Sequence, residues 1–425
     1  MILGTFARHV LLSTLVMVGF AAAPALAGGP DDEALSLGSA PVQSPQTGSE
    51  LRLFVEGAIG IGELHDNAGN QFLRRVSIDF RYLAPLAPGW RAVFSDRLDA
   101  IKPPDLGADT VTNSLREAYL SWQAGGSTLV DVGRVNLRYG PGYGYNPTDF
   151  FRDNSLRTIT SLDPLTWREN RLGTVVIHGQ HLWKDGSVSL AFSPRLDDAP
   201  SQNGLNPDLG ATNNRNRGLL VLSTRFSERL SGQLLAYEES GPQAGVGASG
   251  TVLVSDAITA FVEGMRGREP SVLSRTLGAA QPLMTRNRLA AGLTVTVAGS
   301  LSLTGEYEYN GFALAAADFA ALGRSQPSLQ TAYVQTALQR QDLASRHAWL
   351  VYVTQKDLGL KNLNLTALAR FNAGDNSWLG WVELRHHWDQ FDLALQLQQQ
   401  GGDDATAYGK IPVWRSGRLV ASYFF

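Results

Sequence analysis

Charged side chains recur at alternate positions within several apolar segments of the sequence. Arg75, Asp79 and Arg81 fall on the same face of an extended strand, because successive side chains of a strand point to opposite sides. Such a face, with both signs of charge beside water, suits the selection of ions and polar solutes rather than bond-breaking chemistry. The same alternation predicts further inward-facing residues, namely Arg97, Asp131, Arg134, Arg138, Glu306, Glu308 and Arg385. We expect these side chains to line a hydrated interior, or to pair across strands and stiffen its wall.

Residues that could carry catalysis or hold a metal are not grouped in the sequence. His178 and His181 lie three positions apart, so on a strand they point to opposite faces. The chain contains no G-x-S-x-G elbow and no H-x-x-x-H pair. We therefore predict that the protein is not an enzyme, and that it has no catalytic residue, metal site or cofactor.

Composition excludes several other classes of protein. The chain has 425 residues, 44% hydrophobic and 18% charged, with a formal net charge of −3 and no cysteine. This charge balance excludes a nucleic-acid binder that depends on bulk positive charge. The lack of cysteine excludes disulfides and thiolate metal sites. Beyond the N-terminus, no stretch approaches the ~20 apolar residues of a transmembrane helix, which leaves membrane crossing by strands.

The N-terminus has the pattern of a secretory signal peptide. Arg8 precedes a short apolar run, and the small-residue motif Ala25-Leu26-Ala27 follows that run. We expect residues 1–27 to be this signal peptide. Residues 28–49 are rich in Gly, Pro, Ser and Gln, which predicts a flexible periplasmic tail that could dock a periplasmic partner.

Residues 50–425 alternate between apolar and polar side chains. In the segment 391–398, one face carries Phe and Leu, and the other carries Asp, Ala and Gln. Runs of ~9–11 residues with aromatic ends fit strands that cross a lipid bilayer, whereas strands of soluble sheets are usually ~5–6 residues long. Every backbone group must be paired in lipid, so the sheet has to close. We predict an all-β, antiparallel, up-and-down transmembrane barrel in contact with lipid.

The spacing of turn residues predicts eighteen strands. Eight short turns alternate with nine longer, more polar connections, which places both ends of the barrel on one side. The turn near Asp256 carries the weakest signal, and without it the count falls to sixteen. Bacterial single-chain barrels have even strand numbers, so both counts are admissible. The short turns are expected at 85–89, 124–127, 184–186, 227–229, 255–257, 298–300, 357–362 and 389–390.

Residues 139–170 form the longest early connection. A loop of this length is usually functional or disordered, and its aromatic and turn-forming residues favour order. Asn146 as an N-cap, followed by Pro147 and Asp149, predicts a short helix. We expect the loop to fold into the barrel and narrow it; the alternative is an external cap. Its charged residues would form the constriction, namely Asp149, Arg152, Asp153, Arg157, Asp163, Arg168, Glu169 and Arg171.

A second long connection spans roughly residues 311–345. It is rich in alanine, a strong helix former, so we expect one or two helices there. They would cap or plug the barrel, or belong to an ordinary surface loop.

Two segments resemble outer-membrane proteins of Gram-negative bacteria. The last residues, with Tyr423 and Phe425 on one face, are similar to the terminal strand of such barrels. That similarity implies that Tyr423 and Phe425 form the signal read by the barrel-insertion machinery. The stretch from Gly133-Arg134 through Tyr139-Gly140-Pro141-Gly142 to Asn146-Pro147-Thr148-Asp149-Phe150 resembles a loop motif of porin-like families.

This resemblance implies a location and a function. The barrel would lie in the cell outer membrane, in contact with lipopolysaccharide as well as lipid. It would pass a small solute, by diffusion or export, through a lumen constricted by the loop. Two alternatives remain open at this point. One is an export or assembly barrel gated by a periplasmic partner, and the other is a plugged structural or receptor barrel.

Overall fold

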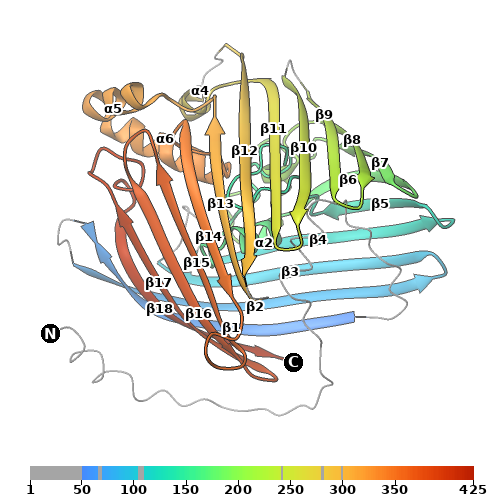
Figure 1. Ribbon diagram of the computed structural model, residues 1–425, viewed down its shortest axis with the longest axis horizontal. Helices are drawn as coiled ribbons and strands as arrows, with labels where there is room; N and C mark the ends of the chain where they lie inside the picture. Colours follow the sequence, from blue (N-terminus) through green and yellow to red (C-terminus); the bar gives the residue numbers. More distant parts are fainter. Residues whose placement is uncertain (1–49, 66–68, 104–109, 241–242, 279–281, 298–299) are drawn as a thin grey trace.

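Eighteen antiparallel strands form one closed sheet in the computed structural model (Figure 1). The structure describes residues 50–425 except 66–68, 104–109, 241–242, 279–281 and 298–299. Each strand pairs with its neighbours in sequence, and β1 (Glu50–Leu64) pairs with β18 (Val413–Phe424) to close the ring. The prediction of an all-β antiparallel barrel with eighteen strands is therefore confirmed. The signal peptide and tail predicted for residues 1–49 lie outside the described residues.

The strands are longest on the early side of the barrel. They range from 18 residues in β2 to 8 residues in β5. In chain order the strands between β1 and β18 are β2 (Asn70–Ala87), β3 (Trp90–Lys102), β4 (Val111–Ala124), β5 (Thr128–Val135), β6 (Thr174–Trp183), β7 (Gly186–Ser193), β8 (Arg217–Ser227), β9 (Leu230–Glu239), β10 (Gln243–Ser255), β11 (Ile258–Glu269), β12 (Met284–Val297), β13 (Leu301–Asn310), β14 (His347–Gln355), β15 (Leu363–Asn372), β16 (Trp378–His387) and β17 (Phe391–Gly401).

The two rims of the barrel differ. One, the short-turn rim, carries the short connections together with the start of β1 and the end of β18, since Phe54 lies opposite Phe424. The turn near Asp256 is present between β10 and β11, which decides between eighteen and sixteen strands. The turn expected at 298–300 falls partly outside the described residues, but the strands on either side of it pair.

The other, the long-loop rim, carries helices. These are α3 (Leu209–Thr212), α4 (Val272–Leu277), α5 (Ala316–Ser325) and α6 (Pro327–Gln339). The last two confirm the helices expected between residues 311 and 345; Pro327 occupies the first turn of α6, where a missing N–H costs nothing. Among the described residues, no helix has the length and apolar character needed to span a membrane.

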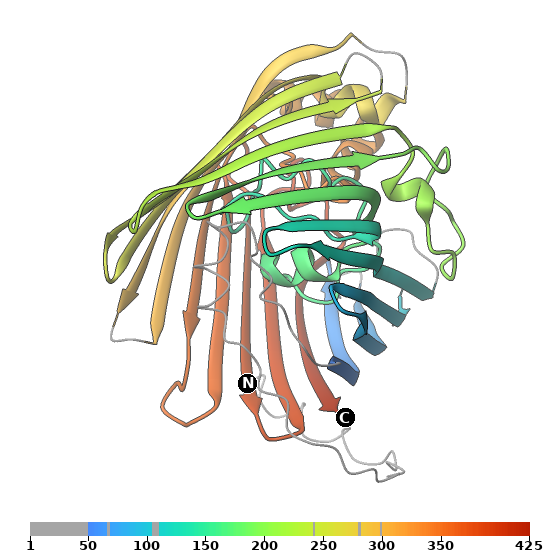
Figure 2. The ribbon, with the colours of Figure 1, turned by 90° about the vertical axis from the view of Figure 1, so that its right-hand side faces the viewer.

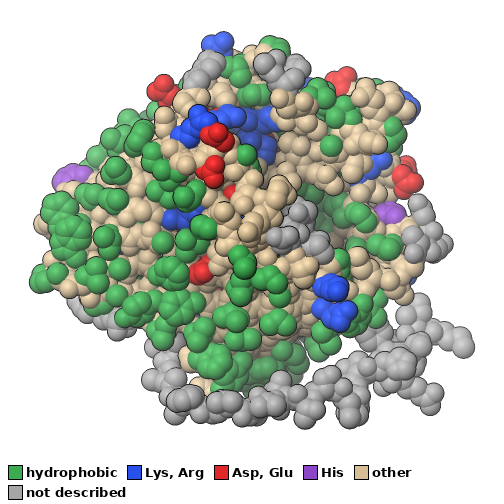
Figure 3. Space-filling view, turned by 180° about the vertical axis from the view of Figure 1, so that it is seen from behind, with side chains coloured by type: hydrophobic (Ala, Val, Ile, Leu, Met, Phe, Trp, Pro, Cys, Tyr) green, Lys and Arg blue, Asp and Glu red, His purple; other side chains and the backbone are tan. Residues whose placement is uncertain are grey.

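The outer face of the barrel is apolar. On β2, Val76 and Ile78 are 56% and 45% exposed, whereas the alternate residues Ser77 and Asp79 are buried inside. Hydrophobic side chains cover much of the face seen in Figure 3, with few charges among them. Near the short-turn rim, the exposed rings of Trp90 and Trp122 stack with centroids 5.6 Å apart. The sheet is closed and has no open edge. Every strand is therefore paired on both sides, as an apolar environment requires.

Residues 139–170, including helix α2 (Pro164–Asn170), lie inside the ring of strands, as Figure 2 shows. They contact opposite walls: Arg370 of β15 donates to the carbonyl of Gly144 at 2.6 Å, and Thr158 donates to Asp99 of β3 at 2.8 Å. The inner wall here is partly apolar, because Phe151 packs against inward-facing residues such as Val176 and Leu219. The segment therefore crosses the barrel interior.

The helix expected after Asn146 is absent. Asn146 does not cap it, because its side-chain amide donates to the carbonyl of Gly142 and to Glu263 of β11. Asp149, expected in the first helical turn, is instead paired with Arg171 at 2.7 Å. Residues 147–151 therefore form turns. The helix of this segment is α2, which starts at Pro164, seventeen residues after Pro147, and is capped by Asp163.

Candidate functional site

The crossing segment divides the lumen into three chambers. We name them by the residue type that recurs in their walls. The arginine chamber, of about 550 Å³, and the threonine chamber, of about 640 Å³, lie toward the short-turn rim. The glutamine chamber, of about 840 Å³, lies toward the long-loop rim, between the segment and helix α6. All three volumes fall in the range of about 300–1,000 Å³ that is typical of small-molecule sites.

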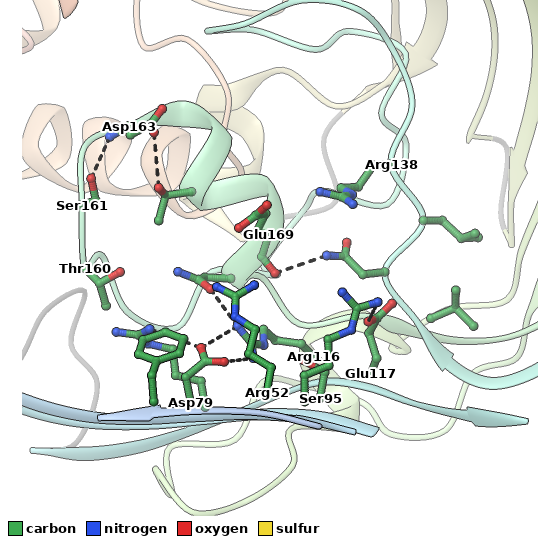
Figure 4. A pocket seen from close by; sticks show the side chains of 18 of the residues that line it. Arg52, Asp79, Ser95, Arg116, Glu117, Arg138, Thr160, Ser161, Asp163 and Glu169 are labelled. Carbon is green, nitrogen blue, oxygen red and sulfur yellow. Dashed lines mark hydrogen bonds and ion pairs between the residues drawn. The ribbon is translucent and has the colours of Figure 1, made fainter. Parts of the chain in front are cut away.

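Charges of both signs line the arginine chamber in equal number. Its wall contains eight arginines and eight carboxylates, so their formal charges cancel. Many are paired with one another: Arg97 lies 3.0 Å from Glu56 and 3.3 Å from Asp79, and Arg116 lies 2.7 Å from Asp79. Figure 4 shows Asp79 and Arg116 on the strand wall, joined by dashed lines. These pairs connect strands β1 to β4 across the inner face of the sheet and leave little net field in the chamber.

Other charged side chains in the same chamber are more accessible. Arg52 and Arg138 are exposed to the lumen, and Figure 4 shows Arg138 on the same side of the chamber as Glu169 of α2. Arg81 is 45% exposed and lies 3.8 Å from Glu117. These side chains can meet a passing solute. Within the described ranges, no cluster of three or more His, Asp or Glu side chains could hold a metal ion.

Asp163 connects helix α2 to the opposite wall. Its carboxylate accepts from the N–H of Leu165 at 3.1 Å, which caps the helix, and from the hydroxyl of Tyr352 on β14 at 3.2 Å. Burial raises the pKa of this carboxyl from 3.8 to about 6, because the charged form loses hydration. Asp163 therefore changes charge in a mildly acidic medium.

The chambers share a few wall residues, and we call those shared by the glutamine and arginine chambers the neck. Ser161 of the crossing segment and Gln396 of β17 line both the glutamine and the arginine chambers. Tyr143 lines both the glutamine and the threonine chambers. Gln396 is held in place, since its amide donates to Glu383 of β16 at 2.6 Å. The glutamine and arginine chambers therefore adjoin between the crossing segment and the wall of β17.

Two buried glutamates anchor the crossing segment. Glu306 of β13 accepts hydrogen bonds from the backbone N–H groups of Tyr143 at 2.6 Å, Gly144 at 3.2 Å and Tyr145 at 2.9 Å. Glu263 of β11 accepts from the N–H of Gly142 at 2.8 Å and from the hydroxyl of Thr148 at 2.6 Å. Each hydrogen bond of this kind contributes about 0.5–1.5 kcal/mol. These carboxylates fix the segment against the wall.

The glycines of the segment allow this close approach. A Cβ at Gly140, where φ is +87°, would lie 2.2 Å from a carboxylate oxygen of Glu263. A Cβ at Gly144 would lie 2.4 Å from a carboxylate oxygen of Glu308. Glycine is therefore required at these two positions because any side chain would push the backbone away from its anchors.

The residues predicted to line the lumen fall into separate places. The arginine chamber brings together Arg75, Asp79, Arg81, Arg97, Asp131, Arg138 and Arg385. Asp149 and Arg152 lie at the glutamine chamber, each in an ion pair, with Arg171 and Asp342. Asp163 and Glu169 also line the arginine chamber, and Arg168 lines the glutamine chamber. Asp153 and Arg171 line none of the three chambers, and each is in an ion pair, with Arg340 and Asp149. Four further predicted residues also line none of the three; these are Arg134, Arg157, Glu306 and Glu308.

Each of these four residues is engaged elsewhere. Arg134 is 2% exposed and donates to the carbonyl of Asp208 at 3.1 Å, and Arg157 donates to the carbonyl of Asn113 at 2.7 Å. Glu306 and Glu308 are fully buried beneath the crossing segment. Alternation predicts that a residue faces inward, but it does not show what covers that residue.

Sequence reasoning missed Glu56, Glu263, Ser161 and Gln396 as functional residues. Glu263 lies between the inward-facing residues Phe261 and Met265, so its strand does not show a polar inner face. Phe261 can face inward although it is apolar, because Tyr143 of the crossing segment packs against it, with ring centroids 5.8 Å apart. Ser161 and Gln396 carry no charge, and only the path of the segment makes them important.

Comparison with known proteins identifies the fold. No protein-family model matches the chain, and no characterised protein matches it in sequence. Among solved structures, OccAB1 of Acinetobacter baumannii is similar with a TM-score of 0.58 and 12% identity, over 90% of this chain and 99% of that one. The outer membrane protein OpdK of Pseudomonas aeruginosa gives 0.56 and 11%, over 89% and 99%.

A third similar structure is a BenF-like porin from Pseudomonas fluorescens Pf-5. Its TM-score is 0.57 and its identity 9%, over 89% of this chain and 99% of that one. At these identities the likeness concerns the path of the backbone and not individual residues. The chain therefore shares the fold of these three structures over almost their whole length.

Proposed function

We propose that the protein is an outer-membrane channel that passes a small solute through a lumen constricted by residues 139–170. The observation that carries this proposal is the meeting of the glutamine and arginine chambers at Ser161 and Gln396. These two chambers lie on opposite sides of the crossing segment and share wall residues, which supports a passage between them. In a plugged barrel, the segment would instead separate them.

The apolar outer face and the polar interior support a membrane location. Alternation along each strand directs residues such as Val76 outward and Asp79 inward, which suits lipid outside and water inside. Short turns of such barrels face the periplasm and long loops face the exterior. The glutamine chamber is then the outer vestibule, and the arginine chamber opens toward the periplasm. The similar structures described as an outer membrane protein and a porin support the same assignment.

The partners follow from this location. The outward-facing surface would contact outer-membrane lipid and lipopolysaccharide, and the terminal strand would be recognised by the barrel-insertion machinery. Phe425 is 51% exposed, and its N–H donates to the carbonyl of Leu53 at 3.0 Å. The rings of Tyr423 and Phe425 lie 4.9 Å apart. Both rings thus remain accessible at the short-turn rim.

Current through single molecules in planar lipid bilayers tests the proposal. We expect the wild type to give steady, ohmic current, and Gln396→Trp to reduce it severalfold by filling the neck. Gln390→Trp makes the same change in an exposed short turn and should leave the current unchanged. Absence of current in the wild type, with current appearing only after residues 139–170 are deleted, would contradict the channel and favour a plugged barrel.

A further inference from the structure

Amide side chains gather in the glutamine chamber from separate parts of the fold. Eight glutamines line this chamber. Gln396, Gln398 and Gln400 follow the inward face of β17, while Gln335 and Gln339 lie one helical turn apart on α6 and are exposed to the chamber. An amide offers two N–H donors and a carbonyl acceptor and carries no charge. The chamber therefore presents donors and acceptors together on opposing walls.

Two of these amides have unused hydrogen-bonding capacity. Gln400 is 1% exposed and donates to the carbonyl of Val413 at 2.9 Å, while its own carbonyl oxygen has no partner among the described residues. Gln398 lies on the wall between Trp381 of β16 and Ser416 of β18, its paired neighbours. A buried acceptor without a donor costs about 1–3 kcal/mol. Gln398 is partly exposed, so an entering hydroxyl group can reach its amide.

The charges at the chamber are mostly neutralised within the protein. Arg152 pairs with Asp342 at 3.5 Å, Arg370 with Glu308 at 2.8 Å, and Asp149 with Arg171 at 2.7 Å. Arg168 is buried and donates to the backbone carbonyls of residues 139, 140 and 142. Lys410 and Arg418 also line the chamber, and both lie at one edge of it, at β18 or just before it.

Aromatic side chains complete the lining. Trp167 of α2 and Tyr408 are partly exposed at the chamber wall, and the indole N–H of Trp167 donates to the carbonyl of Ser161. The faces of such rings carry partial negative charge and attract C–H groups. Flat aromatic faces beside amides match a molecule that has hydroxyl groups at its edge and C–H groups on its face.

We infer that the glutamine chamber is a binding site for a neutral, polyhydroxylated solute of the saccharide class. The amides of α6 and β17 bind its hydroxyl groups from two sides, and Trp167 and Tyr408 pack against its C–H faces. The site lies directly above the neck at Ser161 and Gln396, so a bound solute is placed at the entrance to the arginine chamber. This inference rests on the channel function proposed above and adds the class of solute.

The experiment uses maltotriose as the probe. It is added to the long-loop side of single barrels in a planar bilayer, and the current is recorded at increasing concentration. We expect a saturable block in the wild type. Gln398→Leu and Gln335→Leu should each weaken the block about fivefold to tenfold, since each removes hydrogen bonds of about 1 kcal/mol. Gln390→Leu makes the same change in an exposed short turn and should leave the block unchanged.

Two results would overturn the inference. One is a block by maltotriose that rises without saturation and is equal in the wild type and both leucine variants. The other is a stronger block by glutarate, a dicarboxylate, which would identify Lys410 and Arg418 as the binding groups of an anion site. Gln335 lies on a helix outside the strands, so its variant tests the site even where Gln398→Leu impairs barrel folding.

A titration separates failure of this inference from failure of the channel function. Heat released when maltotriose is added to the folded barrel in a polyoxyethylene detergent reports binding without any current; a maltoside detergent would compete through its head group. Binding in a barrel that carries no current would support the site and contradict the channel. Current without binding would leave the channel standing and overturn the site.

Discussion

Inward-facing arginines of this barrel have two different roles. Arg134 is 2% exposed and donates to backbone carbonyls of the connection that contains α3, so it holds a loop in place. Arg138, four residues later, is exposed at the wall of the arginine chamber. Sequence alternation places both residues inside, and only the packing around each one distinguishes an anchor from a group that meets the solute.

Reversal of the charge at position 138 should therefore change ion selectivity. We expect Arg138→Glu to raise the cation-to-anion permeability ratio by more than about fivefold at low salt, because exchanging +1 for −1 at ~8 Å in water favours a cation by about 1 kcal/mol and disfavours an anion by the same amount. Reversal potentials across a salt gradient measure this ratio. Arg134→Glu should lower the yield of folded barrel instead. Equal selectivity in wild type and Arg138→Glu would place Arg138 outside the path.

Asp163 should make selectivity depend on pH. Burial raises its pKa to about 6, so the carboxyl is neutral below that pH and negative above it. Lowering the pH from 7.5 to 5 should therefore reduce the cation preference, with a midpoint near 6. His178 and His387 line the same chamber, so the variant Asp163→Asn isolates the contribution of Asp163. A pH response that Asp163→Asn leaves intact would assign the titration to another group.

The crossing segment is held by its backbone rather than by helix formation. The motif from Tyr139 to Phe151 predicted an ordered loop, and its order comes from N–H groups that converge on Glu263 and Glu306. The local sequence could not reveal these acceptors, because they lie on strands more than a hundred residues away. The helix expected after Asn146 is absent for the same reason, since Glu263 accepts from the groups that a helix would have used.

Removal of one anchor should loosen the segment. Glu306→Gln replaces a carboxyl group, whose two oxygens accept from three N–H groups, by an amide with one acceptor oxygen, and each lost hydrogen bond is worth about 0.5–1.5 kcal/mol. We expect larger and noisier single-channel current than in the wild type. Glu117→Gln is the matched control, because Glu117 lies on the lumen wall and makes only a 3.8 Å ion pair with Arg81. Wild-type current in Glu306→Gln would show that Glu263 and the neighbouring contacts are sufficient to hold the segment without the carboxyl of Glu306.

At the scale of the whole molecule, the sequence predicts the barrel but not which inward-facing residues line the passage. Alternation and turn residues predicted eighteen strands, and the pairing of β1 with β18 confirms the closed ring. The wall of the passage depends on which inward positions the crossing segment covers. It buries Val176, Leu219 and Glu306, and it leaves Arg138 and Gln396 at chamber walls. That distinction is a property of long-range packing and has no local sequence signal.

The central claim is that the lumen is a continuous passage whose neck includes Ser161. The natural chain has no cysteine, so Ser161→Cys introduces a single thiol. The direct test is the current through this variant while a bulky methanethiosulfonate reagent is added from one side of the bilayer and then, in a separate trial, from the other. The account predicts that the current falls from either side, with no change in the wild type. Current that stays unchanged, or that falls from one side only, would contradict a continuous passage through the neck.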